Sequence, residues 1–255
     1  MSSLKESIKK FVRLLLPFSL QKMHGAQVFM RRTTFFEDGL ATVHNCDFIK
    51  TPRFREAYAK GKATGSWLGA NVRWRVHVAC WVAKQVVDLE GDFIECGVNR
   101  GGLSRAIYDY AELAVRQKTF YLLDTFCGLS PKYINEQELK NGIRPGGYSE
   151  CYEDVLATFK PFQNVKIIRG TVPDTLPEVP ASKIAYLSID MNCVEPEISA
   201  LRYFWGKIVR GGMVLLDDYG FEGHSCQKTA FDEFASAHDF EILSLPTGQG
   251  LIVKK

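Results

Sequence analysis

The chain has 255 residues, a formal net charge of +3 at pH 7 and 46% hydrophobic residues, enough for one large or two small globular domains. A charge so near balance, without an arginine-rich arm, argues against nucleic-acid binding. The seven cysteines form no CxxC pair and no apolar run reaches the roughly 18 residues of a membrane span. We therefore predict reduced thiols and a cytoplasmic location, with no disulfide framework, zinc site or transmembrane segment.

Residues 4 to 16 place apolar side chains at helical spacing among basic ones, and Pro17 ends the pattern. This helix either docks on the protein body or a second subunit, which we favour, or lies on a membrane as a basic amphipathic helix. We therefore expect a homo-oligomer. Residues 1–70 are predicted to form an N-terminal helical extension, serving as a lid or in oligomerisation, and residues 71–255 a separate cofactor-binding domain. A short helix is predicted over 53–60.

One helix is predicted over 67–89, and its His77 is expected at the surface or hydrogen-bonded in a structural role. Strands then alternate with helices, which predicts a mostly parallel sheet with helices on both faces, an α/β architecture. The last two strands are separated by only five residues, too few for a crossover, so they are predicted to form an antiparallel hairpin. The predicted strands are 92–96, 119–126, 165–169, 184–190, 212–217, 240–245 and 251–254, and the helices are 103–116, 152–159, 196–209 and 226–238.

The first of these strands runs into a glycine-rich turn and the start of a helix, over residues 92–104. Glycine lets the backbone approach a ligand closely, and a helix N-terminus favours an anionic group. Asn99 stands where the nicotinamide-binding fingerprint requires glycine, which argues against an NAD-dependent oxidoreductase. An acidic residue before Gly97, with Gly101-Gly102 four residues on, resembles instead the S-adenosylmethionine loop of class I methyltransferases. A mostly parallel, Rossmann-like sheet with a C-terminal antiparallel hairpin is also similar to that class.

Acidic residues stand at the carboxyl ends of the predicted strands, where open parallel sheets bind ligands. Asp124 is placed to accept hydrogen bonds from ribose hydroxyls, and the backbone of Gly170-Thr171 to face an adenine. The carboxylates of Asp190, Asp217 and Asp218 are hard oxygen ligands that suit Mg²⁺. His224, on the loop after Asp218, is either the proton acceptor or an exposed or helix-start residue.

From about Glu90 to the C-terminus the chain resembles the macrocin O-methyltransferase (TylF/MycF-like) family. The motifs that carry the resemblance are Glu95-Cys96-Gly97-Val98-Asn99-Arg100-Gly101-Gly102, Leu123-Asp124-Thr125-Phe126-Cys127-Gly128-Leu129, Gly170-Thr171-Val172-Pro173-Asp174-Thr175-Leu176-Pro177, Leu187-Ser188-Ile189-Asp190 and Leu216-Asp217-Asp218-Tyr219. The resemblance implies magnesium at Asp190, Asp217 and Asp218, and S-adenosylmethionine bound through Glu95, Gly97, Ser104 and Asp124. The full candidate cofactor set is Glu95, Gly97, Arg100, Gly101, Gly102, Ser104, Asp124, Thr125, Gly170, Thr171 and Asp190.

The resemblance implies a magnesium-dependent O-methyltransferase of natural product biosynthesis, acting on a hydroxyl of a sugar or another secondary metabolite. The catalytic candidates are His224, from its position after Asp218, and Asp190. The chain departs from the family after Asp190: Met191-Asn192-Cys193-Val194 replaces the usual Gly-Asp-Leu-Tyr, and Pro196 replaces a common serine. These departures leave the choice of substrate open. Two alternatives remain, a non-catalytic partner that keeps the fold as a binding module and the disfavoured nicotinamide enzyme.

Overall fold

The computed structural model describes residues 33–255, which fall into two compact units that divide between Asp47 and Phe48. In the described part of the first unit, β1 (Phe35–Glu37) and β2 (Leu40–Thr42) pair antiparallel. The turn between them places Asp38 and Gly39 at φ 50° and 74°, the left-handed conformation that two-residue hairpin turns of type I′ require. The helix predicted over residues 4–16 lies outside the described residues.

The second unit is built on a seven-stranded sheet with the order β5-β4-β3-β6-β7-β9-β8. The first five strands in this order are parallel, whereas β9 is antiparallel to both β7 and β8. The predicted α/β sheet with a C-terminal antiparallel hairpin is thus confirmed. The strands are β3 (Asp92–Cys96), β4 (Phe120–Asp124), β5 (Val165–Arg169), β6 (Ile184–Ile189), β7 (Ile208–Leu216), β8 (Leu243–Ser244) and β9 (Gly250–Val253).

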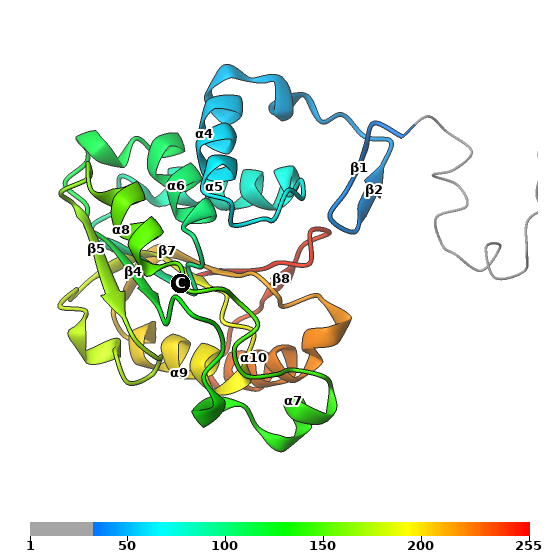
Figure 1. Ribbon diagram of the computed structural model, residues 1–255, viewed down its shortest axis with the longest axis vertical. Helices are drawn as coiled ribbons and strands as arrows, with labels where there is room; N and C mark the ends of the chain where they lie inside the picture. Colours follow the sequence, from blue (N-terminus) through cyan, green and yellow to red (C-terminus); the bar gives the residue numbers. More distant parts are fainter. Residues whose placement is uncertain (1–32) are drawn as a thin grey trace, which may run out of the picture. The chain divides into compact units, whose positions relative to one another are not determined.

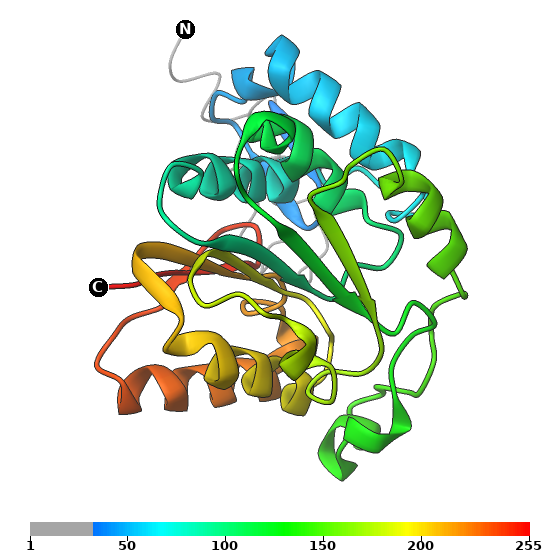
Figure 2. The ribbon, with the colours of Figure 1, turned by 90° about the vertical axis from the view of Figure 1, so that its left-hand side faces the viewer.

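Helices cover both faces of this sheet (Figures 1 and 2). Because side chains alternate across a strand, Phe93 of β3 packs into the core under one helix layer and Ile94 into the core under the other. The first layer contains α4 (Pro52–Ala63), α5 (Arg73–Val86), α6 (Gly102–Tyr110) and α8 (Tyr152–Phe159). The second contains α9 (Val194–Trp205) and α10 (Ser225–Ala237).

Short elements complete the chain, and none of the helices across residues 33–255 combines the length and apolar character needed to cross a bilayer. All seven thiols are free. The short elements are η1 (Asp47–Lys50), η2 (Leu113–Val115), η3 (Pro131–Tyr133), α7 (Glu136–Lys140), η4 (Leu176–Glu178) and η5 (Glu222–His224).

Three predicted helices extend further in the sequence analysis than in the structure. The one predicted to residue 209 ends at Trp205, because β7 already begins at Ile208. The helix predicted from residue 67 begins at Arg73, because Leu68 and Gly69 adopt positive φ and cannot continue a right-handed helix. The helix predicted to residue 116 ends at Tyr110, and Glu112 at φ 58° then separates it from η2. The strand predicted over 240–245 is reduced to the two residues of β8.

His77 packs as an aromatic ring in a partly exposed position, which agrees with the structural role predicted for it. Its ring stacks on Phe48 with centroids 3.9 Å apart and meets Phe54 edge-on. Its Nδ1 is buried without a hydrogen-bond partner among the described residues. Burial lowers the pKa of His77, because a charged ring would lose its hydration there.

Candidate functional site

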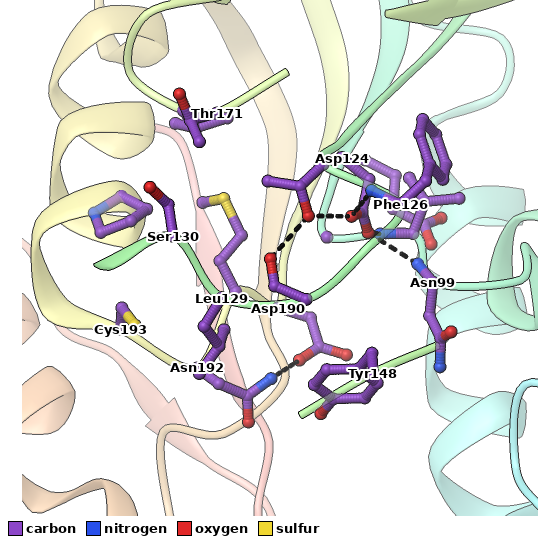
Figure 3. A pocket seen from close by; sticks show the side chains of 18 of the residues that line it. Asn99, Asp124, Phe126, Leu129, Ser130, Tyr148, Thr171, Asp190, Asn192 and Cys193 are labelled. Carbon is purple, nitrogen blue, oxygen red and sulfur yellow. Dashed lines mark hydrogen bonds between the residues drawn. The ribbon is translucent and has the colours of Figure 1, made fainter. Parts of the chain in front are cut away.

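A cavity of about 280 Å³ lies at the carboxyl ends of β3, β4 and β6 (Figure 3). The strand order explains its position, because the chain runs outward from β3 to β4 and β5 and then crosses to β6 on the other side of β3. The connections that follow the neighbouring strands β3 and β6 leave in opposite directions. The crevice between such connections is where α/β sheets bind ligands.

Gly97 allows the ends of β3 and β6 to approach each other at the cavity. Its φ is 91°, and a Cβ atom there would lie 1.7 Å from the carbonyl oxygen of Asp190. The amide of Asp190 donates to the Cys96 carbonyl across the same gap at 2.8 Å. Only glycine fits both the conformation and the space. The glycine of the predicted turn therefore fixes where Asp190 leaves its strand.

Asp124 ties the glycine-rich turn to the end of β4 (Figure 3). One carboxylate oxygen accepts the amide N–H groups of Val98 at 2.6 Å and Asn99 at 2.7 Å. The other accepts the amide of Phe126 at 2.7 Å. The Thr125 hydroxyl also lies 3.3 Å from this second oxygen, but its one proton has a shorter hydrogen bond to the Gly128 carbonyl at 2.7 Å. Because each carboxylate oxygen has two lone pairs, the Phe126-bonded oxygen keeps acceptor capacity. Asp124 thus holds the turn and also lines the cavity.

Glu95 places a buried carboxyl group in the cavity wall. Its exposed fraction is 1%, and its Oε2 has no hydrogen-bond partner of ordinary geometry among the described residues. Burial raises the pKa of Glu95 to about 8; the Ser104 hydroxyl opposes this shift and the charges of Asp217 and Asp124 add to it. A buried, unpaired acceptor favours a ligand that brings a hydrogen-bond donor or a positive charge.

The structure brings part of the predicted cofactor set to the cavity. Arg100 instead pairs with Asp154 of α8 at 2.5 Å, and Ser104 is fully buried behind Glu95. The amide of Gly102 donates to the Ser66 hydroxyl at 2.8 Å, and Gly101 caps α6 at φ 80°. The predicted residues that line the cavity are Glu95, Gly97, Asp124, Thr125, Gly170, Thr171 and Asp190.

Asp190, Asp217 and Asp218 form an acid cluster: each offers a carboxylate oxygen, and these atoms all lie within 4.8 Å of one another. Burial raises the pKa of Asp190 and the charges of the other two carboxylates add to the shift, while Arg75 opposes it. Three acids so close need positive charge nearby. Convergent carboxylate oxygens are also a ligand set that a hard divalent cation prefers.

The acid cluster has close polar neighbours on each side. Arg75 pairs with Asp217 at 2.7 Å, and Asn192 donates to Asp190 at 3.3 Å. The Nε2 of His224 is 3.8 Å from Asp218 Oδ2, and its Nδ1 is hydrogen-bonded to Gln227 at 2.7 Å. His224 therefore presents Nε2 toward the cluster, although it does not line the cavity.

The rim of the cavity is held by two buried glutamates that the sequence analysis missed. Glu197 of α9 accepts the amides of Met191 and Asn192 at 3.0 and 2.8 Å. Glu138 of α7 accepts the amide of Val194 at 2.7 Å and that of Asn135 at 2.9 Å. Both interactions fix backbone rather than touch the cavity. The capping-box spacing of Asn135 and Glu138 was the available signal for the second.

The cavity lining also contains residues that no motif predicted. Trp67 and Arg75 come from the region before β3, and Tyr133 and Tyr148 from the long connection after β4. Their sequence distance from the strand ends explains the omission, because only the tertiary fold brings them there. The aromatic side chains give the cavity an apolar component beside its acids.

Comparison with solved structures identifies the architecture. The structure titled O-methyltransferase NovP matches with a TM-score of 0.62 and 25% identity over 71% of this chain and 79% of that chain. The calicheamicin methyltransferase CalS11 matches with a TM-score of 0.55 and 17% identity over 83% of this chain and 94% of that chain. Fold and cavity position together define a class I methyltransferase fold.

The family follows from the sequence itself. The family model of the macrocin-O-methyltransferases (TylF) matches residues 70–243, and the chain belongs to this family. It is 29% identical, over 60% of its length, to demethyldecarbamoylnovobiocin O-methyltransferase of Streptomyces niveus, and spans 61% of that protein. It is 25% identical, over 51% of its length, to mycinamicin III 3''-O-methyltransferase of Micromonospora griseorubida, and spans 55% of that protein.

Proposed function

We propose that the chain is an S-adenosylmethionine-dependent, magnesium-dependent O-methyltransferase acting on a hydroxyl of a sugar or another secondary metabolite. One observation carries the proposal: a single cavity joins the glycine-rich turn and buried Glu95 to the carboxylates of Asp190 and Asp218. A methyl donor and a cation that binds hydroxyl oxygens would thus meet in one place. Membership in the macrocin-O-methyltransferase family supports the same chemistry.

The cofactor end of the cavity fits S-adenosylmethionine by its donor and acceptor groups. The Glu95 oxygen that has no hydrogen-bond partner within residues 33–255 would suit a positively charged group of this cofactor. S-adenosylmethionine would supply the methyl group when bound. Asp124 retains acceptor capacity for ribose hydroxyls, and Gly170 and Thr171 line the part of the cavity assigned to adenine. The remaining candidates, Arg100, Gly101, Gly102 and Ser104, would act by shaping the turn.

The acid cluster fits a magnesium ion by the chemistry of its donors. Asp190 and Asp218 line the cavity, and Asp217 adds a third carboxylate oxygen within 4.8 Å. A bound divalent cation lowers the pKa of an acceptor hydroxyl and orients it. His224 presents Nε2 to the cluster. The Gln227 amide nitrogen donates to Nδ1, which leaves the proton of a neutral ring on Nε2, so His224 would accept the hydroxyl proton there only after the Gln227 amide turns its oxygen toward Nδ1.

The substrate class is inferred from relatives and from the residues after Asp190. Two relatives are named for methylating demethyldecarbamoylnovobiocin and mycinamicin III, so we infer a small hydroxyl-bearing natural product here. Asn192 adds a neutral amide beside Asp190, and Val194 adds an aliphatic side chain at the start of α9. Asn192 lines the cavity whereas Val194 does not, so Asn192 would select a different acceptor from that of family members with Asp there.

A calorimetric titration of S-adenosylhomocysteine, first with magnesium and then with chelator, tests the cofactor site. We expect binding in both conditions, and methyl transfer to screened glycosylated acceptors only with magnesium. The double change Asp217→Asn with Asp218→Asn is expected to lower transfer at least about 100-fold while S-adenosylhomocysteine still binds. Asp88→Asn, at an exposed ion pair with Arg116, is the matched control. Absence of cofactor binding in both conditions would overturn the proposed function.

A further inference from the structure

The acid cluster already contains a cation from the chain itself. Arg75 stands in the first turn of α5, and its Nη1 lies 2.7 Å from Asp217 Oδ2. The two side chains are 19% and 4% exposed, so water screens the pair weakly. A guanidinium remains charged throughout the working pH range of proteins. The pair therefore supplies a permanent positive charge to the three carboxylates.

The second oxygen of Asp217 is also engaged. Gln249, which is fully buried, donates from Nε2 to Asp217 Oδ1 at 2.9 Å. Thr247 donates to the Gln249 side-chain oxygen at 2.9 Å, so the amide is oriented with its NH₂ group toward the carboxylate. Asp217 is thus held from both sides, by an arginine before β3 and by a glutamine in the β8–β9 turn.

Arg75 reaches the cavity in which the divalent cation would bind, and this position determines how the Arg75–Asp217 ion pair affects the metal site. Arg75, Asp190 and Asp218 line the cavity, whereas Asp217 is not among its lining residues. The guanidinium also stacks over the Phe221 ring at 4.9 Å from its centroid. A divalent cation held by all three aspartates needs an Asp217 oxygen, and the oxygen nearest Arg75 already accepts a hydrogen bond from a charged group.

We propose that Arg75 and the divalent cation compete for Asp217, so that the Arg75–Asp217 pair and full metal coordination exclude each other. Two positive charges at one carboxylate repel strongly where water is scarce. Arg75 is then a positioning residue: it neutralises the cluster in the metal-free protein and sets the affinity for metal. This inference rests on the proposed magnesium site and adds a residue that opposes its occupation.

The test measures Mn²⁺ binding by the electron paramagnetic resonance signal of the free ion, with no substrate present. Arg75→Met removes the charge and keeps an aliphatic stem, and Arg75→Gln keeps a neutral hydrogen-bond donor toward Asp217. We expect both variants to bind Mn²⁺ at least about tenfold more tightly than the unaltered protein, which corresponds to about 1.4 kcal/mol. Arg75→Lys retains the charge and is expected to restore weaker binding. Arg116→Met, which removes the exposed partner of Asp88, is the matched control and should leave the affinity unchanged.

Thermal unfolding gives a second readout if a variant is unstable without metal. Saturating Mn²⁺ should raise the Tm of Arg75→Met and Arg75→Gln by more than it raises that of the unaltered protein. Competition is also reciprocal, so saturating Mg²⁺ should shift the Arg75 guanidinium signal in ¹⁵N NMR. That signal is assigned by its absence in Arg75→Met.

The outcomes separate the inference from the proposed function. Unchanged or weaker Mn²⁺ binding in both neutral variants would overturn the competition, because Arg75 would then be neutral toward the metal or support it. Absence of Mn²⁺ binding in the unaltered protein and in every variant would overturn the proposed magnesium site itself, and the inference with it. Binding that appears only when the charge is removed would support both.

Discussion

The carboxyl group of Glu95 makes the stability of the metal-free protein depend on pH. Its pKa is about 8 in the fold, against an ordinary value of 4.5 for a glutamate in water. Between these values the folded protein keeps a proton that the unfolded chain has released, so the free energy of unfolding falls as pH rises through this window. Glu95→Gln removes this dependence.

We expect the stability of Glu95→Gln relative to the unaltered protein to increase by about 2–4 kcal/mol between pH 5 and pH 8. Urea unfolding at several pH values, without ligand, measures this difference. Glu90→Gln is the control, because Glu90 is 71% exposed and paired with Lys183. Parallel curves for the unaltered protein and Glu95→Gln would contradict the assignment.

Gly97 gives a second prediction for a single residue. A methyl group at this position would overlap the Asp190 carbonyl oxygen, and the φ of 91° is strained for alanine. We expect Gly97→Ala to lower the free energy of unfolding by at least about 3 kcal/mol. Gly206→Ala is the control, since Gly206 has an ordinary φ of −70° and open space around its Cα. Chemical denaturation compares the two, and equal losses would show that the strand ends can separate.

At the scale of elements, α7 is attached to the cavity rim through one side chain. Glu138 uses both carboxylate oxygens as acceptors, for Val194 of α9 and for Asn135 at the start of its own helix. In Glu138→Gln one of these oxygens becomes an NH₂ group that faces an N–H donor, and a buried donor loses its acceptor.

In Glu138→Gln, hydrogen exchange is expected to accelerate about tenfold at whichever of the amides of Val194 and Asn135 faces the new NH₂ group, as a loss of about 1.4 kcal/mol in local stability requires. The amides of β3 and β6 should keep their protection. Glu136→Gln changes an exposed residue of the same helix and should leave exchange as it is. Unaltered exchange at both Val194 and Asn135 would show that Glu138 does not hold the rim.

Elements differ in how well sequence predicts them, and the reason is physical. β3 and β5 have the predicted bounds, since short apolar strands between turn signals carry their own pattern. The β1–β2 hairpin and α7 were missed because three-residue strands and a five-residue helix have too little periodicity. The sequence places Asp190, Asp217 and Asp218 at the ends of strands in a parallel sheet, and this was sufficient to predict that their carboxylates lie close together. Arg75 and Gln249 were not predicted, because their contacts with Asp217 span 142 and 32 residues.

For the whole molecule, the two units can be tested separately. Every cavity-lining residue lies between Ser66 and Asp218, within the unit Phe48–Lys255. We expect a chain that begins at Asp47, which keeps η1 intact, to bind S-adenosylhomocysteine within about threefold of the full chain, a difference of about 0.7 kcal/mol. Calorimetry measures the affinity, and light scattering on both chains tests the predicted homo-oligomer.

Loss of cofactor binding in that shortened chain would show that the first unit contributes to the site. It would favour the lid role predicted for residues 1–70 over a role in assembly. Retained binding with a smaller assembly would favour oligomerisation. The role of this segment and the predicted boundary at residue 70 stay predictions, although α4 belongs to the second unit and packs on α6.

The two hydrogen bonds that fix Asp217, from Arg75 and from Gln249, have a consequence for protein synthesis. Arg75 emerges from the ribosome early, but Gln249 reaches Asp217 only when β9 pairs with β7, from Met213 opposite Val253 to Leu216 opposite Gly250. The acid cluster therefore cannot reach its final geometry before β9 has been synthesised and has left the ribosome. Translation that terminates before β9 is complete yields a polypeptide with most of its sheet but an incompletely ordered acid cluster.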